Sequence, residues 1–281
     1  MPHTSPYRRR SRGAFLLVAE PARYPAARPR LLMLALLLAS LGLAVAAGQP
    51  RSAPAAPASV PTSAFSPPAD VAAPPIMRKL VRGDVSRPEV ALTFDDGPNP
   101  ATTRLLLALL RMYRARATFF LIGDSVRQRP ELVRAMVADG HAIGNHTARH
   151  ARLLPLETEQ VREEIAGCDA ALRRCGVVTR LFRPPGGRYD DRILDVVNAA
   201  GLTLVQWTVN PGDYTRPGAD VIADRVLDQT TNGSIVLLHD GCEQTLTALP
   251  RILHTLAERG YRCVTVDEML ERAGGGADRG W

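Results

Sequence analysis

Aromatic residues are scarce in this chain, at 5% of 281 residues, and the body of the sequence has no basic stripe interleaved with them. Surfaces that bind nucleic acids usually combine both features. The formal net charge of +7 does not change this, because seven arginines and a single glutamate precede Leu31, and the rest of the chain is nearly neutral. We therefore expect no nucleic-acid partner.

Cysteine is also sparse, and the four cysteines are Cys168, Cys175, Cys242 and Cys263. None has the Cys-x-x-Cys spacing of a zinc or redox motif. An oxidising compartment would permit two disulfides. Cys168 and Cys175 cannot pair inside one continuous helix, because a rise of about 1.5 Å per residue would separate them by about 10 Å. Disulfides and buried free thiols both remain open.

Long apolar runs are absent except for Leu31–Ala47, which follows the basic segment and contains small residues suited to signal-peptidase cleavage at Ala44–Ala46. The run is slightly short for a membrane span of about 20 residues and slightly long for the core of a signal peptide. A cleaved signal peptide and an uncleaved N-terminal membrane anchor both fit residues 1–48. In either case we expect the body to be secreted or otherwise outside the cytoplasm.

Proline, alanine and serine dominate from Gln49 to Pro75, with almost nothing to bury. This composition predicts a disordered linker over residues 49–87. Residues 88–272 have the length of one catalytic domain, and residues 273–281 are expected to form a flexible tail. We expect a monomer.

Short apolar runs alternate with amphipathic segments in this domain. The strands predicted are Val90–Phe94, Ala117–Ile122, His141–Gly144, Leu181–Arg183, Thr203–Trp207, Ser234–Leu238 and Arg262–Thr265. The helices predicted are Thr102–Tyr113, Pro130–Asp139, Glu157–Leu172, Asp190–Ala200, Ala219–Gln229 and Leu246–Arg259. This alternation predicts a parallel sheet, either a barrel or an open doubly wound sheet, with functional residues at the C-terminal ends of the strands.

Two clusters at predicted strand ends suggest metal chemistry. Asp95 and Asp96 follow a strand, although Asp-Asp-Gly-Pro is also typical of a turn. Adjacent carboxylates repel each other unless a cation lies nearby, so one can bind a metal while the other acts as a base. His146 and His150 share a face if their segment is helical. One aspartate and these two histidines would hold a divalent ion and leave positions open for water and substrate.

Three more clusters follow predicted strands. Arg183 can pair with a carboxylate, and the Pro-Pro-Gly-Gly loop after it exposes a glycine N–H that can stabilise an oxyanion. His239 becomes a candidate acid if Asp213 accepts its ring proton. Each cluster alone is also typical of a loop or a surface side chain. Their shared position at strand ends favours a single site.

The five motifs, in this order from about Pro88 to Asp267, resemble the polysaccharide deacetylase family, also called the NodB-like domain or carbohydrate esterase family 4. The resemblance implies an irregular (β/α)7 barrel with its active site at the C-terminal ends of the strands. It implies that Asp95 is the catalytic base, and that the metal ligands are Asp96, His146 and His150.

The same resemblance implies roles for the other motif residues. Arg183 would hold the base, the N–H of Gly186 would complete the oxyanion site, Asp213 and His239 would form the general acid, and Leu237 would line the acetyl pocket. The sequence departs from the family pattern at four positions. A tyrosine is common at Gly186, a tryptophan at Tyr214, an aspartate at Asn210 and a bulkier residue at Ala148. None of these changes removes a ligand or a proton carrier, but Tyr214 gives a different substrate wall.

We therefore expect a metal-dependent N-deacetylase that releases acetate from an extracellular N-acetylated polysaccharide, with Zn²⁺ or alternatively Co²⁺ or another divalent ion. Peptidoglycan N-acetylglucosamine is the first choice of substrate and chitin-type oligomers the second, while O-deacetylation of acetylated xylan remains an alternative. Two other classes are a barrel hydrolase of cyclic amides and a wall-binding protein with an inactive site. The leader argues against the first, and the retained motif residues argue against the second.

Overall fold

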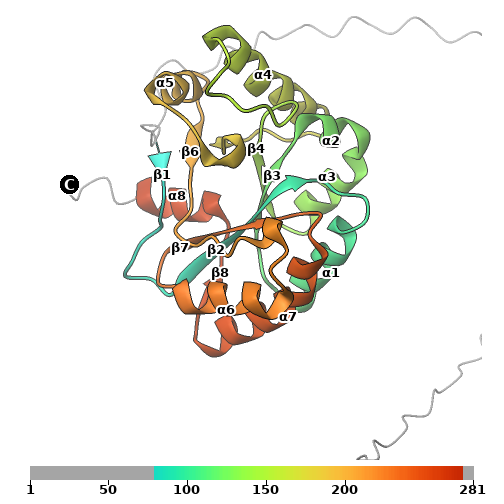
Figure 1. The fold of residues 1–281 in the computed structure, drawn as a ribbon, viewed down its shortest axis with the longest axis vertical. Coiled ribbons are helices and arrows are strands. Elements are labelled where there is room, and N and C mark those ends of the chain that lie inside the picture. Colours follow the sequence, from blue (N-terminus) through green and yellow to red (C-terminus); the bar gives the residue numbers. More distant parts are fainter. Residues whose placement is uncertain (1–78, 275–281) are drawn as a thin grey trace, which may run out of the picture. The chain divides into compact units, whose positions relative to one another are not determined.

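The computed structural model describes residues 79–274 (Figure 1). The predicted leader, most of the predicted linker and most of the C-terminal tail lie outside these residues and stay predictions. Strand β1 (Lys79–Leu80) falls inside the segment predicted as linker, and for these residues that prediction is wrong. Leu80 is buried in a core cluster and pairs with Val205. A strand of two residues is too short to produce a recognisable hydrophobic pattern in the sequence.

One sheet of parallel strand pairs forms the centre of the domain. Its other strands are β2 (Glu89–Gly97), β3 (Thr118–Leu121), β4 (Ala142–Asn145), β5 (Leu181–Phe182), β6 (Thr203–Val205), β7 (Ser234–His239) and β8 (Arg262–Cys263). The strand order is β1-β6-β5-β4-β3-β2-β7, and β8 pairs with the start of β2. All seven strands predicted from the sequence are present, with ends that shift by at most three residues.

Helices surround the sheet (Figure 1). They are α1 (Thr103–Met112), α2 (Gly123–Gln128), α3 (Pro130–Ala138), α4 (Thr158–Arg174), α5 (Asp191–Ala199), α6 (Ala219–Gln229), α7 (Glu243–Glu258) and α8 (Val266–Gly274). The six predicted helices are confirmed, and α2 and α8 were missed. Helix α2 has six residues and follows β3 almost directly, so it is too short to show an amphipathic period. Among the described residues, no helix is long and apolar enough to cross a membrane.

The strand order is that of an irregular barrel. Strands β2 to β6 are neighbours in sequence order, without the reversal that defines a doubly wound sheet. Strands β6 and β7 do not form a ladder in the described part of the chain. A single parallel bridge between Val209 and Val236 joins the segment after β6 to β7, and the N–H of Leu237 donates to the carbonyl of Val209. The predicted α/β class is confirmed, although the hydrogen bonding around the sheet is not continuous.

The side chains of β2 alternate between the hydrophobic core and the candidate site. Val90, Leu92 and Phe94 belong to the large core cluster shared with the helices. Thr93 and Asp95 point to the opposite face, because successive side chains of a strand alternate. The register pairs Thr93 with Leu237 and Asp95 with His239. The inner face therefore brings polar side chains of two adjacent strands together at their C-terminal ends.

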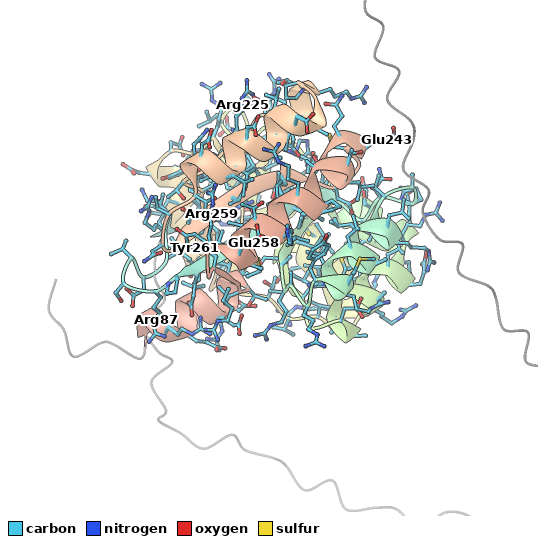
Figure 2. The ribbon with its side chains drawn as sticks, turned by 90° about the horizontal axis from the view of Figure 1, so that it is seen from below. Arg87, Arg225, Glu243, Glu258, Arg259 and Tyr261 are labelled. Atoms are coloured by element: carbon cyan, nitrogen blue, oxygen red, sulfur yellow. The ribbon has the colours of Figure 1, made fainter. Side chains whose placement is uncertain are left out.

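Helices α6 and α7 pack side by side on the outside of the sheet (Figure 2). Arg259, at the C-cap of α7, donates to the backbone carbonyl of Leu227 in the last turn of α6. A cation in this position also interacts favourably with the C-terminal end of the α6 helix dipole. This contact ties the C-terminal ends of α6 and α7 to each other.

The cysteines are free thiols. Cys168 lies within α4 and Cys175 is the C-cap residue of that helix, so the continuous helix keeps the two apart. Burial raises the pKa of Cys168 to about 12, which makes it an unreactive core residue. Of the two alternatives left open by the sequence, the structure contains the free thiols.

Candidate metal centre and active site

A break in strand regularity lets two consecutive aspartates reach one site. Adjacent residues of a strand normally face opposite ways. The pairing of β2 with β3 shifts register between Asp95 and Gly97, and Asp96 has a left-handed φ of 72°. Such a bulge re-aims a side chain, and aspartate tolerates the left-handed region better than most residues. Asp95 therefore keeps its inward direction while Asp96 turns toward the loop after β4.

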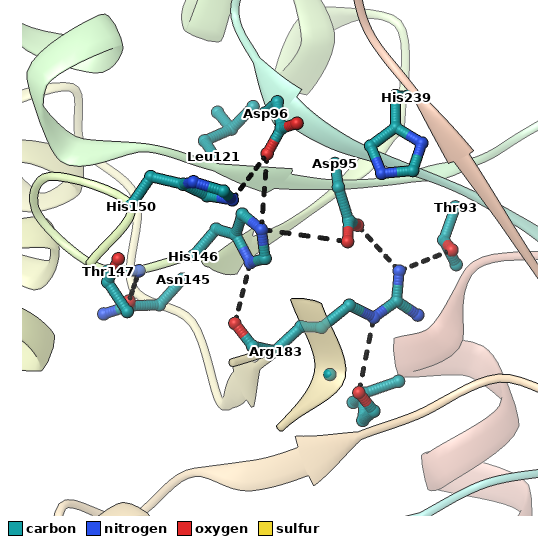
Figure 3. Close-up of polar contacts among 12 residues, drawn as sticks. Thr93, Asp95, Asp96, Leu121, Asn145, His146, Thr147, His150, Arg183 and His239 are labelled. Carbon is teal, nitrogen blue, oxygen red and sulfur yellow. Dashed lines mark hydrogen bonds and ion pairs between the residues drawn. The ribbon is translucent and has the colours of Figure 1, made fainter. Parts of the chain in front are cut away.

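The loop after β4 brings the two predicted histidines to Asp96. The Nε2 atoms of His146 and His150 lie 3.4 and 3.2 Å from Asp96 Oδ1, and the ring centroids are 5.1 Å apart (Figure 3). The segment is not helical, because His150 and Thr147 have left-handed φ angles of 59° and 69°. The helical turn considered for this pair is therefore wrong, and an irregular loop juxtaposes the rings instead.

Buried polar side chains hold this loop in its irregular conformation. Asn145 accepts a hydrogen bond from the N–H of Thr147 at 2.9 Å and donates to the carbonyl of Ile165 in α4. Glu164, which is also buried in α4, accepts from the backbone N–H of Arg149 at 3.0 Å and from its guanidinium at 2.7 Å. Side-chain acceptors thus replace the backbone partners that a helix would have supplied.

The three side chains fit a divalent cation. Asp96 Oδ1 is buried and has no hydrogen-bond partner among residues 79–274, which is costly unless another group satisfies it. His146 Nδ1 donates to the carbonyl of Arg183 at 2.7 Å, so its Nε2 lone pair faces Asp96. One carboxylate oxygen and two imidazole nitrogens are a common donor set for zinc and similar ions, and the three ligand atoms lie within 4.8 Å of one another.

The electrostatics of Asp96 agree with an ionised ligand. Burial opposes ionisation, but the interactions with His146 and His150 lower the pKa of Asp96 well below its ordinary value. The interaction with Asp96 in turn raises the pKa of His150. Asp96 is therefore a carboxylate at any pH at which the histidines can donate a lone pair.

Asp95 forms a buried ion pair with Arg183. Arg183 Nη1 donates to Asp95 Oδ1 at 2.7 Å and to Thr93 Oγ1 at 2.7 Å. The guanidinium also contacts the carbonyls of Val205 and Gln206, and its side chain is 0% exposed. Burial lowers the pKa of Arg183. Because these acceptors fix the guanidinium, the second oxygen of Asp95 stays directed into the site, 3.8 Å from His146 Nε2.

Aromatic rings flank the same guanidinium. Its central carbon lies 4.1 Å from the ring centroid of Phe120 and 5.5 Å from that of Trp207. A cation over an aromatic face gains electrostatic stabilisation, more so where water is excluded. These two ring contacts add to the hydrogen bonds that hold the guanidinium of Arg183 in place.

Asp213 and His239 form the predicted pair. His239 Nδ1 lies 2.8 Å from Asp213 Oδ1, and Asp213 Oδ2 accepts from the backbone N–H of His239 and from Thr245 Oγ1, both at 2.8 Å. Asp213 has an exposed fraction of 0%. Burial alone would lower the pKa of His239, but the hydrogen bond and charge of Asp213, with the charges of Asp95 and Asp96, raise it above its ordinary value.

The remaining predicted residues lie around this centre. Tyr214 is 61% exposed, and its ring meets the His239 ring edge-on at 5.5 Å. Leu237 is buried two residues before His239 on the same face of β7. Gly186 is exposed in the short 3-10 helix η1 (Pro185–Gly187), with a left-handed φ of 65° that suits glycine. In Figure 3, His239 and the two loop histidines flank the aspartates from opposite sides.

Four polar residues of the site were missed by the sequence reasoning: Thr93, Asn145, Glu164 and Asp240. Thr93, Asn145 and Asp240 lie within two residues of assigned motif residues at strand ends, and their polarity in otherwise apolar runs was a usable signal. Glu164 lies in the middle of the amphipathic helix α4, where a glutamate is ordinary. Only the folded structure shows that this glutamate is buried.

Comparisons with known proteins agree with this geometry. A family model described as polysaccharide deacetylase matches residues 82–205. A chitooligosaccharide deacetylase of Sinorhizobium fredii is 40% identical over 200 residues, which are 66% of this chain and 93% of the relative. A peptidoglycan-N-acetylglucosamine deacetylase of Bacillus cereus is 41% identical over 186 residues, covering 64% and 87% of the two chains.

A solved structure shows the same fold. The family 4 carbohydrate esterase from Streptomyces lividans, in complex with acetate, superposes with a TM-score of 0.60 at 38% sequence identity, covering 62% of this chain and 90% of that chain. The resemblance predicted from the five motifs is thus confirmed over the described domain. The chain belongs to the polysaccharide deacetylase family.

Proposed function

We propose that this chain is a metal-dependent N-deacetylase of an extracellular polymer of N-acetylglucosamine. The observation that carries the proposal is the convergence of three groups at the same strand ends: the ligand set around Asp96, the Arg183-bound Asp95 and the Asp213-bound His239. Together they offer a cation site, a base and an acid, which are the groups that amide hydrolysis needs.

Asp96, His146 and His150 would hold the metal, for which Zn²⁺ is the first choice and Co²⁺ or another divalent ion an alternative. When bound, the ion supplies a Lewis acid that polarises the amide carbonyl and lowers the pKa of a water molecule. His146 is already oriented for this role, because its Nδ1 proton is committed to the Arg183 carbonyl.

Asp95 is the proposed base. It accepts a proton from water as the water oxygen attacks the carbonyl carbon of the acetamide. Arg183 and Thr93 hold Asp95 in place through one shared guanidinium nitrogen. The oxygen of Asp95 that does not bind Arg183 remains free for the proton.

Gly186 and His239 complete the reaction. Attack converts the carbonyl oxygen to an oxyanion, and the N–H of Gly186, in the exposed loop after β5, would stabilise it. Protonated His239, oriented by Asp213, gives its Nε2 proton to the nitrogen as the carbon–nitrogen bond breaks. The products are acetate and a free amine.

The relatives and the predicted leader support the choice of substrate. The relatives named above act on chitooligosaccharide and on peptidoglycan N-acetylglucosamine. An exported enzyme meets peptidoglycan first, so we place it ahead of chitin-type oligomers and of acetylated xylan. Exposed Tyr214 beside His239 provides a flat surface on which a sugar ring can stack.

Release of acetate from peptidoglycan, chitin oligomers and acetylated xylan tests the proposal, with free amine as a second product readout for the first two. Asp95→Asn should lower kcat by about 10²- to 10⁴-fold with metal content unchanged. The matched control is Asp224→Asn, the same substitution at an exposed residue of α6 that pairs with Arg251, and it should keep normal activity. No acetate release from any polymer by the metal-loaded parent protein would refute the proposal.

A further inference from the structure

Asp240 is a buried carboxylate that the proposed reaction does not use. It follows His239 at the end of β7 and is 5% exposed. Burial raises its pKa. A buried carboxylate is unfavourable unless several donors satisfy it, so its partners indicate what it does in the fold.

The partners of Asp240 lie on the segment after the two site aspartates. Asp240 Oδ1 accepts from Thr102 Oγ1 at 2.6 Å, and Oδ2 accepts from Thr103 Oγ1 at 2.5 Å and from the backbone N–H of Asn99 at 3.3 Å. Its own backbone N–H donates to the carbonyl of Asp95 at 2.9 Å. One residue thus links the end of β7 to both sides of the bulge at Asp95 and Asp96, called the Asp95–Asp96 turn below.

Gly97 permits this close approach. A Cβ atom on Gly97 would lie 2.6 Å from Asp240 Oδ2, so the chain leaving Asp96 passes directly against the carboxylate. Asp96 itself has the left-handed backbone conformation noted above, and such conformations persist where surrounding contacts impose them. The contacts of Asp240 are of this kind.

We propose that Asp240 is a positioning residue that fixes the Asp95–Asp96 turn relative to His239. Through Thr102, Thr103 and Asn99 it holds the strand end that carries the base and the metal ligand, and through its chain connection it holds the acid. The catalytic part of this inference rests on the proposed deacetylase function. The part that concerns the Asp96 ligand does not, because metal affinity can be measured without turnover.

The test compares Asp240→Asn and Asp240→Ala with the parent protein loaded with Co²⁺. Asparagine keeps the volume but replaces one acceptor oxygen by an NH2 group, which cannot accept from Thr102 in one orientation or from Thr103 and Asn99 in the other. The control is Glu89→Gln, which changes another buried carboxylate. Glu89 binds Arg262 and Arg272 at the opposite end of β2, so the control should lower the melting temperature without affecting the site.

We expect Asp240→Asn to lower kcat about tenfold or more with KM within about twofold of the parent value, and to weaken Co²⁺ binding by about tenfold. Asp240→Ala should give the larger effect of the two. Thr102→Val, which removes one donor, should shift both quantities in the same direction by less. Glu89→Gln should leave kcat and Co²⁺ affinity unchanged.

A merely structural role would lower the melting temperature of the Asp240 variants but leave kcat and Co²⁺ affinity, each expressed per folded molecule, at parent values. That result would overturn the proposal. If Asp240→Ala does not fold, Asp240→Asn and Thr102→Val decide the question. If the parent binds Co²⁺ but releases acetate from no polymer, the proposed function fails, and the Co²⁺ affinities still decide the role of Asp240.

Discussion

Replacing Asp213 by asparagine perturbs the acid half of the site without changing its shape. Each carboxylate oxygen of Asp213 faces a nitrogen of His239: Oδ1 faces ring Nδ1, and Oδ2 faces the backbone N–H. An asparagine has only one oxygen. Its amide group must therefore oppose either the backbone N–H or ring Nδ1, and in the second case His239 is forced into the tautomer with its proton on Nε2 and a lone pair on Nδ1.

The size of the effect follows from the distance. Two unit charges 2.8 Å apart interact by about 6 kcal/mol at an effective dielectric constant of about 20, which is an upper limit for the loss. Neighbouring charges usually shift a pKa by about 1 to 3 units, or about 1.4 to 4 kcal/mol. Asp213 raises the pKa of His239, so Asp213→Asn should lower that pKa.

The direction of the pKa shift of His239 determines how kcat should depend on pH. The acid form of His239 is needed to protonate the leaving amine, and it is lost as the pH rises through the pKa of this residue. In the parent protein that loss should occur above pH 6.5, because the pKa is raised. In Asp213→Asn, the basic limb of the profile of kcat against pH should move to lower pH, and kcat at its optimum should fall by about 10²- to 10⁴-fold.

The assay is acetate release from N-acetylglucosamine oligomers across pH 5 to about 10, with melting temperature and metal content measured on the same preparations. Thr245→Val is the control, since it removes one hydrogen bond to Asp213 Oδ2 and keeps the charge. Thr245→Val should leave the basic limb of the profile of kcat against pH close to its position in the parent protein. A basic limb at the parent position in Asp213→Asn, with kcat within about twofold of the parent value, would refute the reasoning.

Three further predictions concern the metal, acid stability and packing. Asp96→Ala should lose metal on dialysis and activity with it, while chelation of the parent protein should abolish activity that Zn²⁺ or Co²⁺ restores, as followed by metal analysis and acetate release. Burial lowers the pKa of His141 to about 4, below the value of about 6.5 expected in the unfolded chain, so stability should fall as the pH drops from 6.5 to 4. His141→Gln should remove up to about 3 kcal/mol of that loss in denaturant titrations, and identical pH slopes in both proteins would contradict it. Gly144→Ala places a Cβ 2.4 Å from the ring of Phe120, so it should cost about 2 kcal/mol of unfolding free energy and lower kcat, because Phe120 packs on Arg183. An unchanged melting temperature would show that the ring moves freely.

The strand and helix pattern was readable from the sequence because it depends on local periodicity. Runs such as Val90–Phe94 and Ser234–Leu238 are buried strands, and the amphipathic helices bury one face, so both leave a signal within a short window. Elements without such a window were missed. Strand β1 has two residues, and its place in the sheet depends on β6, more than 120 residues along the chain.

The candidate site was readable for a related reason. In a parallel barrel, the C-terminal ends of all strands meet at one end, so polar residues that follow each strand are near neighbours in space. This rule predicts that Asp95, His146, Arg183, Asp213 and His239 lie close together. The structure brings all five together.

The way in which these side chains meet could not be read from the sequence. Consecutive residues Asp95 and Asp96 share the site only because a bulge interrupts β2, and the loop histidines meet Asp96 through left-handed residues rather than a helical turn. Both conformations are held by side chains distant in sequence, such as Glu164 for the loop and Asp240 for the turn.

By itself the sequence determined the α/β fold class and the family, and it predicted the candidate site residues, because these follow from local periodicity and from motif order. The tertiary structure alone decided how two consecutive aspartates share one site, which oxygen of Asp95 is left free by Arg183, and which buried carboxylate hydrogen-bonds to the segment that follows them. The physical reason is that burial, backbone strain and hydrogen-bond partners depend on contacts between segments, and no window along the chain contains them.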